Sequence, residues 1–169
     1  MMATLYYAAR LAPDCDPHGR RARRVQSGEA EALLSDLRAA AGLPQGPSSK
    51  SHARAMCAVA AAESGRVGVD VEWIGAARDL TALARFLLDS ADFGGDVEAL
   101  YRVWTFREAA FKAFGVFPDL AQRRSVFLAR DHGEAPWRWG EGALLFRRLE
   151  RDFQMCVAWD QAGAFTRLL

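Results

Sequence analysis

Apolar residues recur along the chain with two spacings, and each spacing predicts one kind of secondary structure. Continuous or alternating apolar runs predict strands, which we expect at residues 5–11, 56–62, 66–72, 125–129, 143–149 and 153–159. Apolar residues three and four positions apart predict helices. We expect one helix to end at Gly42, one to run from Asp79 through Leu88, and one to run from Asp96 to Gly115. The mixture of the two patterns predicts an α+β protein.

Turn residues and local similarity indicate how the strands are related. Gly65 lies between the strands expected at 56–62 and 66–72, so we expect these two to pair as a hairpin. The apolar segments at 56–60 and 155–159 resemble each other and raise the idea of an internal duplication. Five loosely matched positions are too few to establish it.

The Pro-, Gly- and Ser-rich stretch at 44–49 is the clearest change in composition along the chain. It predicts a boundary between an abbreviated N-terminal lobe, 1–47, and a larger lobe, 48–169. A chain of 169 residues can also form one compact domain over 1–169. The sequence leaves both organisations open.

Composition and charge exclude several classes of function. The 22 basic and 21 acidic residues leave a formal net charge of +1, so no protein-wide field favours nucleic acid or a membrane surface. The three cysteines show neither disulfide-framework nor zinc-site spacing. No apolar run approaches the roughly 18 residues of a membrane helix, and the N-terminus lacks a secretory pattern. We therefore expect a cytoplasmic protein with no nucleic-acid and no membrane partner.

Arginines cluster where Arg20, Arg21, Arg23 and Arg24 precede or begin the first predicted helix. Such a charge run is usually a solvated face. An anion-binding role is the competing interpretation, and the pattern alone does not decide between the two.

Three carboxylates and a lysine are spaced so that they can act together. Asp70 and Glu72 are two residues apart in an apolar strand, so their side chains point to the same face. Glu108 and Lys112 are four residues apart in a helix and also share a face. Carboxylate oxygens suit a hard cation, and a neighbouring ammonium suits a phosphate. The alternatives are a solvated strand end and an ordinary helix salt bridge. Unpaired charge beside apolar core residues is costly, which favours the joint site.

A serine and a histidine form a further polar element. His52 follows Lys50 and Ser51 at the expected entrance to the strand at 56–62. A lone histidine is more often packed or hydrogen-bonded than catalytic. Next to Lys50 and Ser51, however, it could help to bind a phosphate.

Taken in order, these segments resemble the 4′-phosphopantetheinyl transferase superfamily. The family's pattern is a Ser-His element, a Gly-x-Asp-x-Glu strand and a Trp-x-x-Lys-Glu-x-x-x-Lys helix. The corresponding segments here are Ser51-His52, residues 68–72 and residues 104–112, and the resemblance covers roughly 51–159. It implies a lobe with an antiparallel sheet and packed helices, preceded by an abbreviated first lobe in a pseudo-twofold arrangement.

The resemblance also implies a reaction. The 4′-phosphopantetheine arm of coenzyme A would be moved onto a serine of an acyl or peptidyl carrier protein, in an Mg²⁺-dependent step that releases adenosine 3′,5′-bisphosphate. This is the holo-acyl-carrier-protein synthase activity that serves fatty acid, polyketide and nonribosomal peptide biosynthesis.

Roles for individual residues follow from the same resemblance. Asp70, Glu72 and Glu108 correspond to the Mg²⁺ ligands, with Glu108 or a metal-bound water accepting the serine proton. Lys112 corresponds to the group that contacts the pyrophosphate. Ser51 and His52 correspond to part of the coenzyme A phosphate site. Arg20 and Arg24 are expected to add phosphate contacts from the first lobe, although no family motif covers them.

The chain departs from the family pattern at three places. Arg107 stands where lysine is common, Ala53 where a second serine often follows the histidine, and Ser48-Ser49 where an aromatic-Asn pair is usual. These departures keep open a non-catalytic homologue that binds coenzyme A or a carrier protein. A metal-dependent nuclease is a second alternative, because acidic trios with a lysine also serve phosphodiester cleavage.

Overall fold

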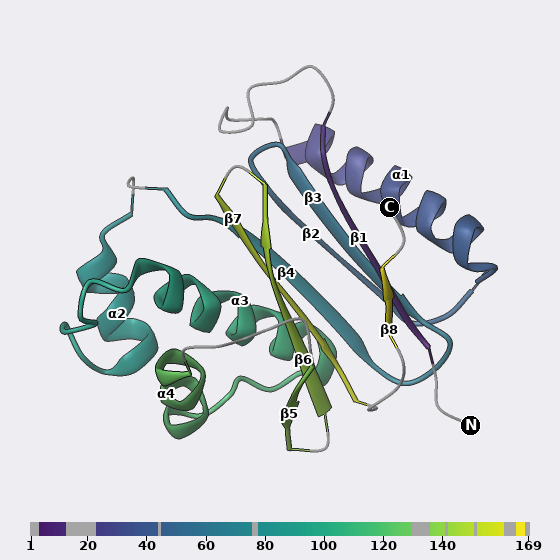
Figure 1. Ribbon diagram of the computed structural model, residues 1–169. Coiled ribbons are helices and arrows are strands. Elements are labelled where there is room, and N and C mark those ends of the chain that lie inside the picture. The colour runs from purple at the N-terminus through teal and green to yellow at the C-terminus, as the bar shows by residue number, and fades with distance from the viewer. Residues whose placement is uncertain are drawn as a thin grey trace.

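The computed structural model describes residues 4–12, 23–43, 45–75, 78–129, 136–140, 142–150, 152–160 and 165–167. Within these residues, eight strands and four helices form two four-stranded sheets with helices on both sides (Figure 1). The strands are β1 (Leu5–Leu11), β2 (Ser48–Ala53), β3 (Met56–Ala62), β4 (Val67–Trp73), β5 (Trp137–Trp139), β6 (Gly142–Leu149), β7 (Phe153–Trp159) and β8 (Phe165–Arg167). The helices are α1 (Arg23–Ala41), α2 (Leu80–Leu88), α3 (Val97–Phe114) and α4 (Leu120–Leu128). The expected α+β class is confirmed.

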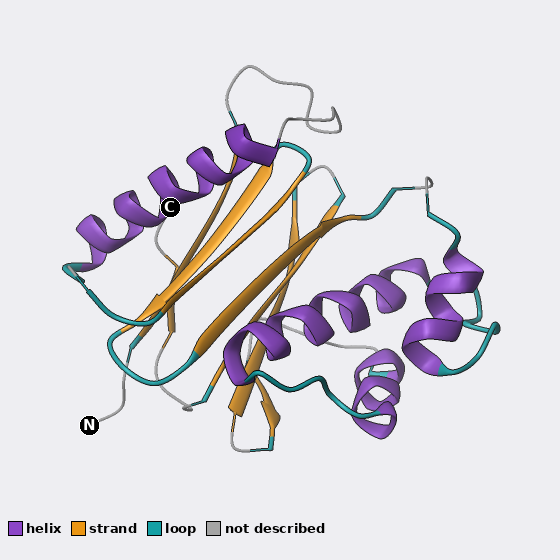
Figure 2. Ribbon diagram, turned by 180° about the vertical axis from the view of Figure 1, so that it is seen from behind, coloured by secondary structure: helices purple, strands orange, loops and turns teal. Residues whose placement is uncertain are grey.

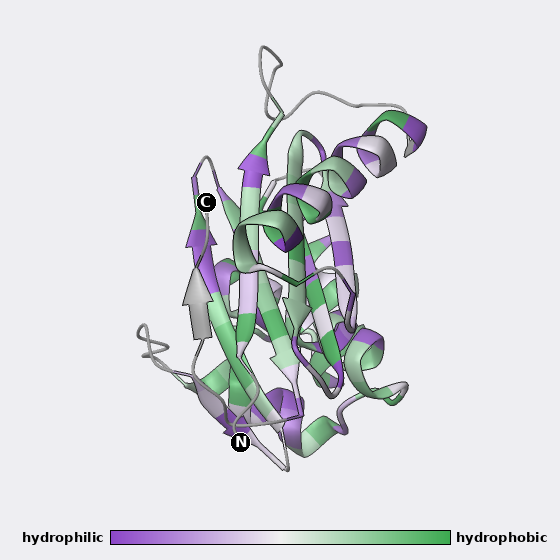
Figure 3. Ribbon diagram, turned by 90° about the vertical axis from the view of Figure 1, so that its right-hand side faces the viewer, coloured by the Kyte–Doolittle hydropathy of each residue, from purple (hydrophilic) through white to green (hydrophobic). Residues whose placement is uncertain are grey.

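The two sheets pack against each other at the centre of the molecule. The first has the spatial order β2-β3-β1-β8 and the second β4-β7-β6-β5, and every pairing except the parallel β1–β8 pair is antiparallel. Helix α1 covers the outer side of the first sheet, and α3, with α2 and α4 beside it, covers the outer side of the second (Figure 2). One hydrophobic cluster fills each of these three contacts. In Figure 3 many of the hydrophobic residues, coloured green, lie on the strands.

Both sheets contain the same order of elements. The first unit is β1-α1-β2-β3, and the second has the same order, β4-α3-β6-β7, once the additional elements α2, α4 and β5 are set aside. In each case the last strand of the unit lies between the other two. The two similar apolar segments at 56–60 and 155–159 lie on these central strands, β3 and β7. The strands β2 and β3, which follow residue 47, thus belong to the same sheet as β1.

Capping residues set the ends of the central helices as expected. Asp79 precedes α2 and accepts from the Ala82 amide at 2.9 Å, and Asp96 precedes α3 and accepts from the Ala99 amide at 2.8 Å. Gly115 ends α3 with a left-handed φ of 73°. The predicted bounds of α2 and α3 are therefore confirmed.

Three predictions of local structure are wrong. The strands β3 and β4 do not form a hairpin, because β3 pairs with β1 and β2 whereas β4 pairs with β7. Residues 125–128 belong to helix α4, which Asp119 and Gln122 begin with a reciprocal capping box. Ser51 and His52 lie inside a strand, β2, which begins within the stretch interpreted as a linker. None of the helices in the described ranges is long and apolar enough to cross a membrane.

Candidate functional site

Helix α3 lies directly on strand β4 because Gly68 leaves room for it. A Cβ atom at Gly68 would lie 2.1 Å from the Ala109 carbonyl oxygen and 2.7 Å from the Ala113 nitrogen. Both are backbone atoms that a side chain cannot displace without moving the helix. The absence of a side chain at this position therefore sets the distance at which α3 presents its residues to β4.

This close approach joins Lys112 to Asp70. The Lys112 ammonium donates to Asp70 Oδ1 at 2.8 Å and to the Val69 carbonyl oxygen at 2.9 Å. Asp70 is only 5% exposed, and burial raises the pKa of its carboxyl, although Lys112 and the Ser51 hydroxyl act in the opposite direction. The second oxygen, Asp70 Oδ2, is buried and has no hydrogen-bond partner. It is a hard oxygen donor of the kind that a divalent cation prefers.

Strand β2 runs beside β4 in the same direction, and two serines connect them. The Ser49 hydroxyl accepts from the Val69 amide at 3.0 Å, and the Ser51 hydroxyl accepts from the Val71 amide at 3.3 Å. Ser51 also donates to Asp70 Oδ1 at 2.9 Å. The serines thus satisfy amides at the edge of β4 and orient the Asp70 carboxylate.

Glu72 lies two residues further along β4, and both of its oxygens have partners. Oε2 accepts from Arg78 at 2.7 Å, and Oε1 accepts from the Trp104 indole at 3.0 Å. The Arg78 guanidinium also lies 4.9 Å from the Trp104 ring centroid. Burial raises the pKa of Glu72 to about 7; Arg78 opposes this rise, and the charge of Asp70 adds to it.

Glu108 forms an ion pair with its neighbour Arg107. Its side chain is 29% exposed, so it is the most accessible of the three carboxylates. The charge of Glu108 contributes to the raised pKa of Asp70. Asp70 therefore interacts electrostatically with both Glu72 and Glu108, and each of the three carboxylates is paired with a basic residue.

These groups can be compared with the needs of a metal ion. In the part of the chain that the structure describes, no three His, Cys, Asp or Glu side chains are close enough together to hold one. The chemistry of the donors nevertheless fits Mg²⁺, which prefers carboxylate oxygens. The unpartnered Asp70 Oδ2 and the mutual repulsion of the carboxylates are both features that a bound cation would relieve.

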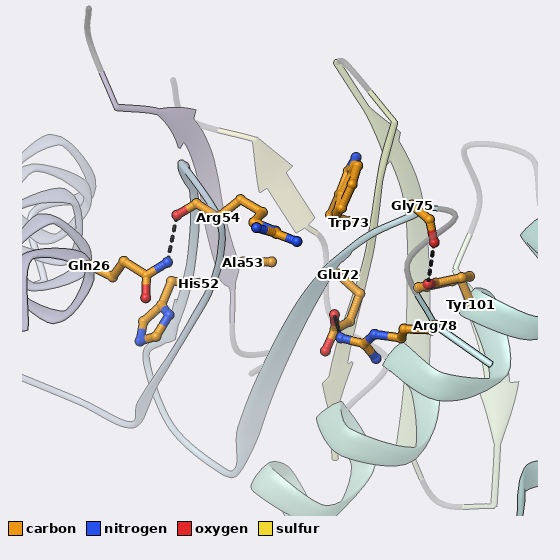
Figure 4. Close-up of a pocket in the computed structure, with 9 residues that line it drawn as sticks. All are labelled: Gln26, His52, Ala53, Arg54, Glu72, Trp73, Gly75, Arg78 and Tyr101. Carbon is orange, nitrogen blue, oxygen red and sulfur yellow. Dashed lines mark hydrogen bonds and ion pairs between the residues drawn. The ribbon is translucent and has the colours of Figure 1, made fainter. Parts of the chain in front are cut away.

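A cavity of about 370 Å³ opens beside Glu72 (Figure 4). One wall comes from α1 and the turn between β2 and β3, and the opposite wall from the end of β4, the segment before α2, and α3. The residues that line it are Gln26, His52, Ala53, Arg54, Glu72, Trp73, Gly75, Arg78 and Tyr101. Basic and aromatic groups in one cavity suit a ligand with phosphate groups and a planar ring.

The predicted site residues are placed in two groups. Asp70, Glu108 and Lys112 lie at the contact of β4 with α3, and Ser51 joins them from β2. His52 and Glu72 line the cavity. Arg24 is exposed at the start of α1 and does not line the cavity, whereas Arg20 and Arg21 lie outside the described residues.

Arg54 and Arg78 were not predicted as residues of the site. Each lies in a short connection next to a predicted element, where an arginine is usually solvated. The only available signal was their position close to His52 and to Glu72 in the chain. Comparison of the chain with protein-family models gives no match, and comparison with curated proteins gives none either.

Proposed function

We propose that the protein transfers the 4′-phosphopantetheine group of coenzyme A to a serine of an acyl or peptidyl carrier protein, in the cytoplasm. One observation carries this proposal. The strand motif and the helix motif are joined by the ion pair between Asp70 and Lys112, next to a cavity with basic and aromatic walls. The repeated β-α-β-β order supports the two-lobed, pseudo-twofold arrangement that the family resemblance implies.

Coenzyme A would occupy the cavity beside Glu72. His52 and the arginines of the cavity would bind phosphate, and the partly exposed ring of Trp73 offers apolar surface for the adenine. Two of the three Lys112 ammonium protons are used by Asp70 and Val69. The third remains available for an oxygen of the diphosphate.

The reaction assigned to this site is a displacement at phosphorus. Glu108 would take the proton of the carrier serine, since its carboxylate is partly exposed and can meet a protein substrate. The serine oxygen would then bond to the phosphorus that bears the pantetheine arm, and the bond to the bridging oxygen would break. Adenosine 3′,5′-bisphosphate leaves with that oxygen, and Lys112 would stabilise its charge.

Mg²⁺ fits this proposal as the cofactor. Asp70, Glu72 and Glu108 would hold it, and when bound it would neutralise charge on the diphosphate. To bind the metal, Glu72 would have to break its ion pair with Arg78, and Glu108 its ion pair with Arg107. A readjustment of side chains is therefore part of the proposal.

The pairing of every carboxylate with a basic residue also favours the second candidate, a homologue that binds coenzyme A or a carrier protein without catalysis. Incubation of an apo carrier protein with coenzyme A and Mg²⁺ separates the two. The transferase adds the mass of the phosphopantetheine arm to the carrier. Binding of coenzyme A without this gain in mass would support the non-catalytic homologue.

Two substitutions test the assigned residues. Asp70→Ala and Glu108→Gln should each abolish Mg²⁺-dependent transfer, because each removes a charged carboxylate from the proposed metal site. Glu31→Gln, on the exposed side of α1, is the matched loss of a surface carboxylate and should transfer normally. Full transfer by either of the first two variants would show that the metal assignment is wrong.

A further inference from the structure

Arg78 occupies one oxygen of Glu72, a carboxylate of the proposed metal site. Its guanidinium donates to Glu72 Oε2 at 2.7 Å, while the Trp104 indole donates to Oε1 at 3.0 Å. The Glu72 side chain is 18% exposed, compared with 29% for Glu108, the other carboxylate that pairs with an arginine. Water therefore weakens the pair of Glu72 and Arg78 less than it weakens the pair at Glu108.

Two aromatic rings hold the Arg78 guanidinium beside this carboxylate. It lies 4.9 Å from the ring centroid of Trp104 and 5.8 Å from that of Tyr101. Figure 4 shows the Arg78 side chain extending from the start of α2 toward Glu72. The Tyr101 hydroxyl also donates to the Gly75 carbonyl oxygen at 3.4 Å, which ties α3 to the segment before α2. Arg78 is thus placed as an internal cation for Glu72.

The Arg78 side chain has room to leave this position. It is 41% exposed, and it lines the cavity of about 370 Å³. The next residue, Asp79, caps α2 by accepting from the Ala82 amide at 2.9 Å. Because this cap does not involve the guanidinium, Arg78 can turn away from Glu72 while α2 stays in place.

We propose that Arg78 competes with a divalent cation for Glu72, so that the protein neutralises this carboxylate itself until the ion pair breaks. The inference rests on the proposed function, which assigns Asp70 and Glu72 to a metal site. A guanidinium and a divalent cation repel each other, so they cannot share Oε2 of Glu72. Asp70 Oδ2, in contrast, is buried and has no hydrogen-bond partner to displace. Glu72 is therefore the carboxylate at which Arg78 sets the affinity for the cation.

Calorimetric titration with Mg²⁺ alone tests this competition. The measurement is made at pH 8.5, above the pKa of Glu72, which burial raises to about 7. Arg78→Gln should bind Mg²⁺ about 10-fold more tightly than wild-type protein, the scale of one charge-assisted hydrogen bond. Arg78→Lys keeps the charge without the planar guanidinium and should show a smaller gain. In a Glu72→Gln background, Arg78→Gln should give no gain, because the carboxylate for which the two cations compete is absent.

Arg10→Gln is the matched control for the loss of one positive charge. Arg10, on β1, pairs with Asp36 at 3.2 Å, and both side chains are about half exposed. Its replacement should leave the affinity for Mg²⁺ unchanged. The competition would be overturned by an unchanged or lower affinity in Arg78→Gln, by an equal gain in Arg10→Gln, or by a gain that persists in the Glu72→Gln background.

The transfer assay distinguishes failure of this inference from failure of the proposed function. A gain in Mg²⁺ affinity that depends on Glu72, in a protein that modifies no carrier, would overturn only the proposed function. An unchanged affinity in Arg78→Gln, in a protein that does modify a carrier, would overturn only the competition. Absence of Mg²⁺ binding in both wild-type protein and Arg78→Gln would overturn the competition whatever the result of the transfer assay.

Discussion

Lys112 and Asp70 form an ion pair of 2.8 Å although 42 residues separate them in the chain. Asp70 is 5% exposed, and its Oδ1 atom receives both this ammonium and the Ser51 hydroxyl. The pair therefore holds helix α3 to strand β4 and compensates a buried charge at the point where the two sequence motifs meet.

Replacement of Lys112 by methionine should leave this carboxylate buried and unpaired. We expect the free energy of unfolding to fall by about 3 kcal/mol, the lower end for a broken buried pair, because 31% of the Lys112 side chain is exposed. Urea denaturation at neutral pH measures the loss. The second substitution Asp70→Asn in the same chain should recover part of it. The control is Lys50→Met, whose partner Glu31 is 61% exposed and whose loss should cost less than about 0.5 kcal/mol. Equal losses for the two lysines would contradict the structural role of the pair.

Gly68→Ala should destabilise the protein through backbone contacts alone. The added methyl group would meet the Ala109 carbonyl oxygen at 2.1 Å, so α3 must shift, at an expected cost of about 3 kcal/mol. Gly28→Ala is the opposite case, because nothing lies within 4 Å of a Cβ atom there. In the second turn of α1 this change should stabilise by about 0.5–1 kcal/mol. Thermal and urea unfolding compare the two variants, and a neutral Gly68→Ala would show that α3 does not depend on this contact.

Local signals in the sequence account for the elements that were predicted correctly. Asp79 and Asp96 are capping residues directly before apolar stripes, so α2 and α3 could be located to the residue. Strand partners could not be predicted in this way. All seven residues of β3 are buried, and such a run identifies a strand without indicating which neighbours it pairs with. Turn spacing therefore favoured the hairpin with β4, whereas β3 pairs with β1 and β2 in the first sheet.

Helix α4 was missed because its strongest signal lies before the segment that was read as a strand. The capping box of Asp119 and Gln122 begins the helix, but the apolar run at 125–129 dominated the pattern. Only Val126 of that helix is buried, so it has no clear apolar stripe.

Site residues could be predicted where they are related by their spacing within one strand or helix. They could not be predicted where they are brought together by contacts between loops and other elements. Residues two apart on a strand and four apart on a helix identified Asp70, Glu72, Glu108 and Lys112. The structure joins Lys112 to Asp70 directly. The pairing of Glu72 with Arg78 and the stacking of Arg54 on Trp73 arise from loop conformation, which carries no periodic signal.

The stability of the protein should depend on pH through Glu72. Burial raises the pKa of Glu72 from 4.5 to about 7, so the native state binds more protons than the unfolded state between these values. The contribution of Glu72 to the free energy of unfolding therefore falls as pH rises through this window, by up to about 3 kcal/mol, and is constant above it. The free energy of unfolding of Glu72→Gln, relative to that of wild type, should therefore increase by up to about 3 kcal/mol from pH 5 to pH 8. Urea unfolding at both ends measures the difference, with Glu31→Gln as the surface control. A constant difference between wild type and Glu72→Gln would contradict the raised pKa.

Arg107→Lys tests whether the guanidinium itself, and not only its charge, is needed at this position. The Arg107 guanidinium lies 3.6 Å from the ring centroid of Phe117 and 4.7 Å from that of Phe86, and it also pairs with Glu108. A planar guanidinium can lie against two rings and still donate to a carboxylate, whereas a compact ammonium cannot make all three contacts. We expect a loss of about 1 kcal/mol in the free energy of unfolding, since that is the scale of a partly exposed cation–π contact. Under the proposed function, carrier modification should persist, because the charge beside Glu108 is kept.

Arg66→Lys is the control for this change. Arg66 lies over the single ring of Phe114 and pairs with Asp160, so lysine can preserve more of its contacts. Urea unfolding of both variants, together with fluorescence of a dye that binds exposed apolar surface, should show the larger change for Arg107→Lys. Phe86 and Phe117 are already 54% and 44% exposed, and removal of the flat group between them should uncover more of both rings. A variant with unchanged stability and dye binding would mean that the two-ring contact contributes nothing to the fold, and that Arg107 matters only through its charge on Glu108.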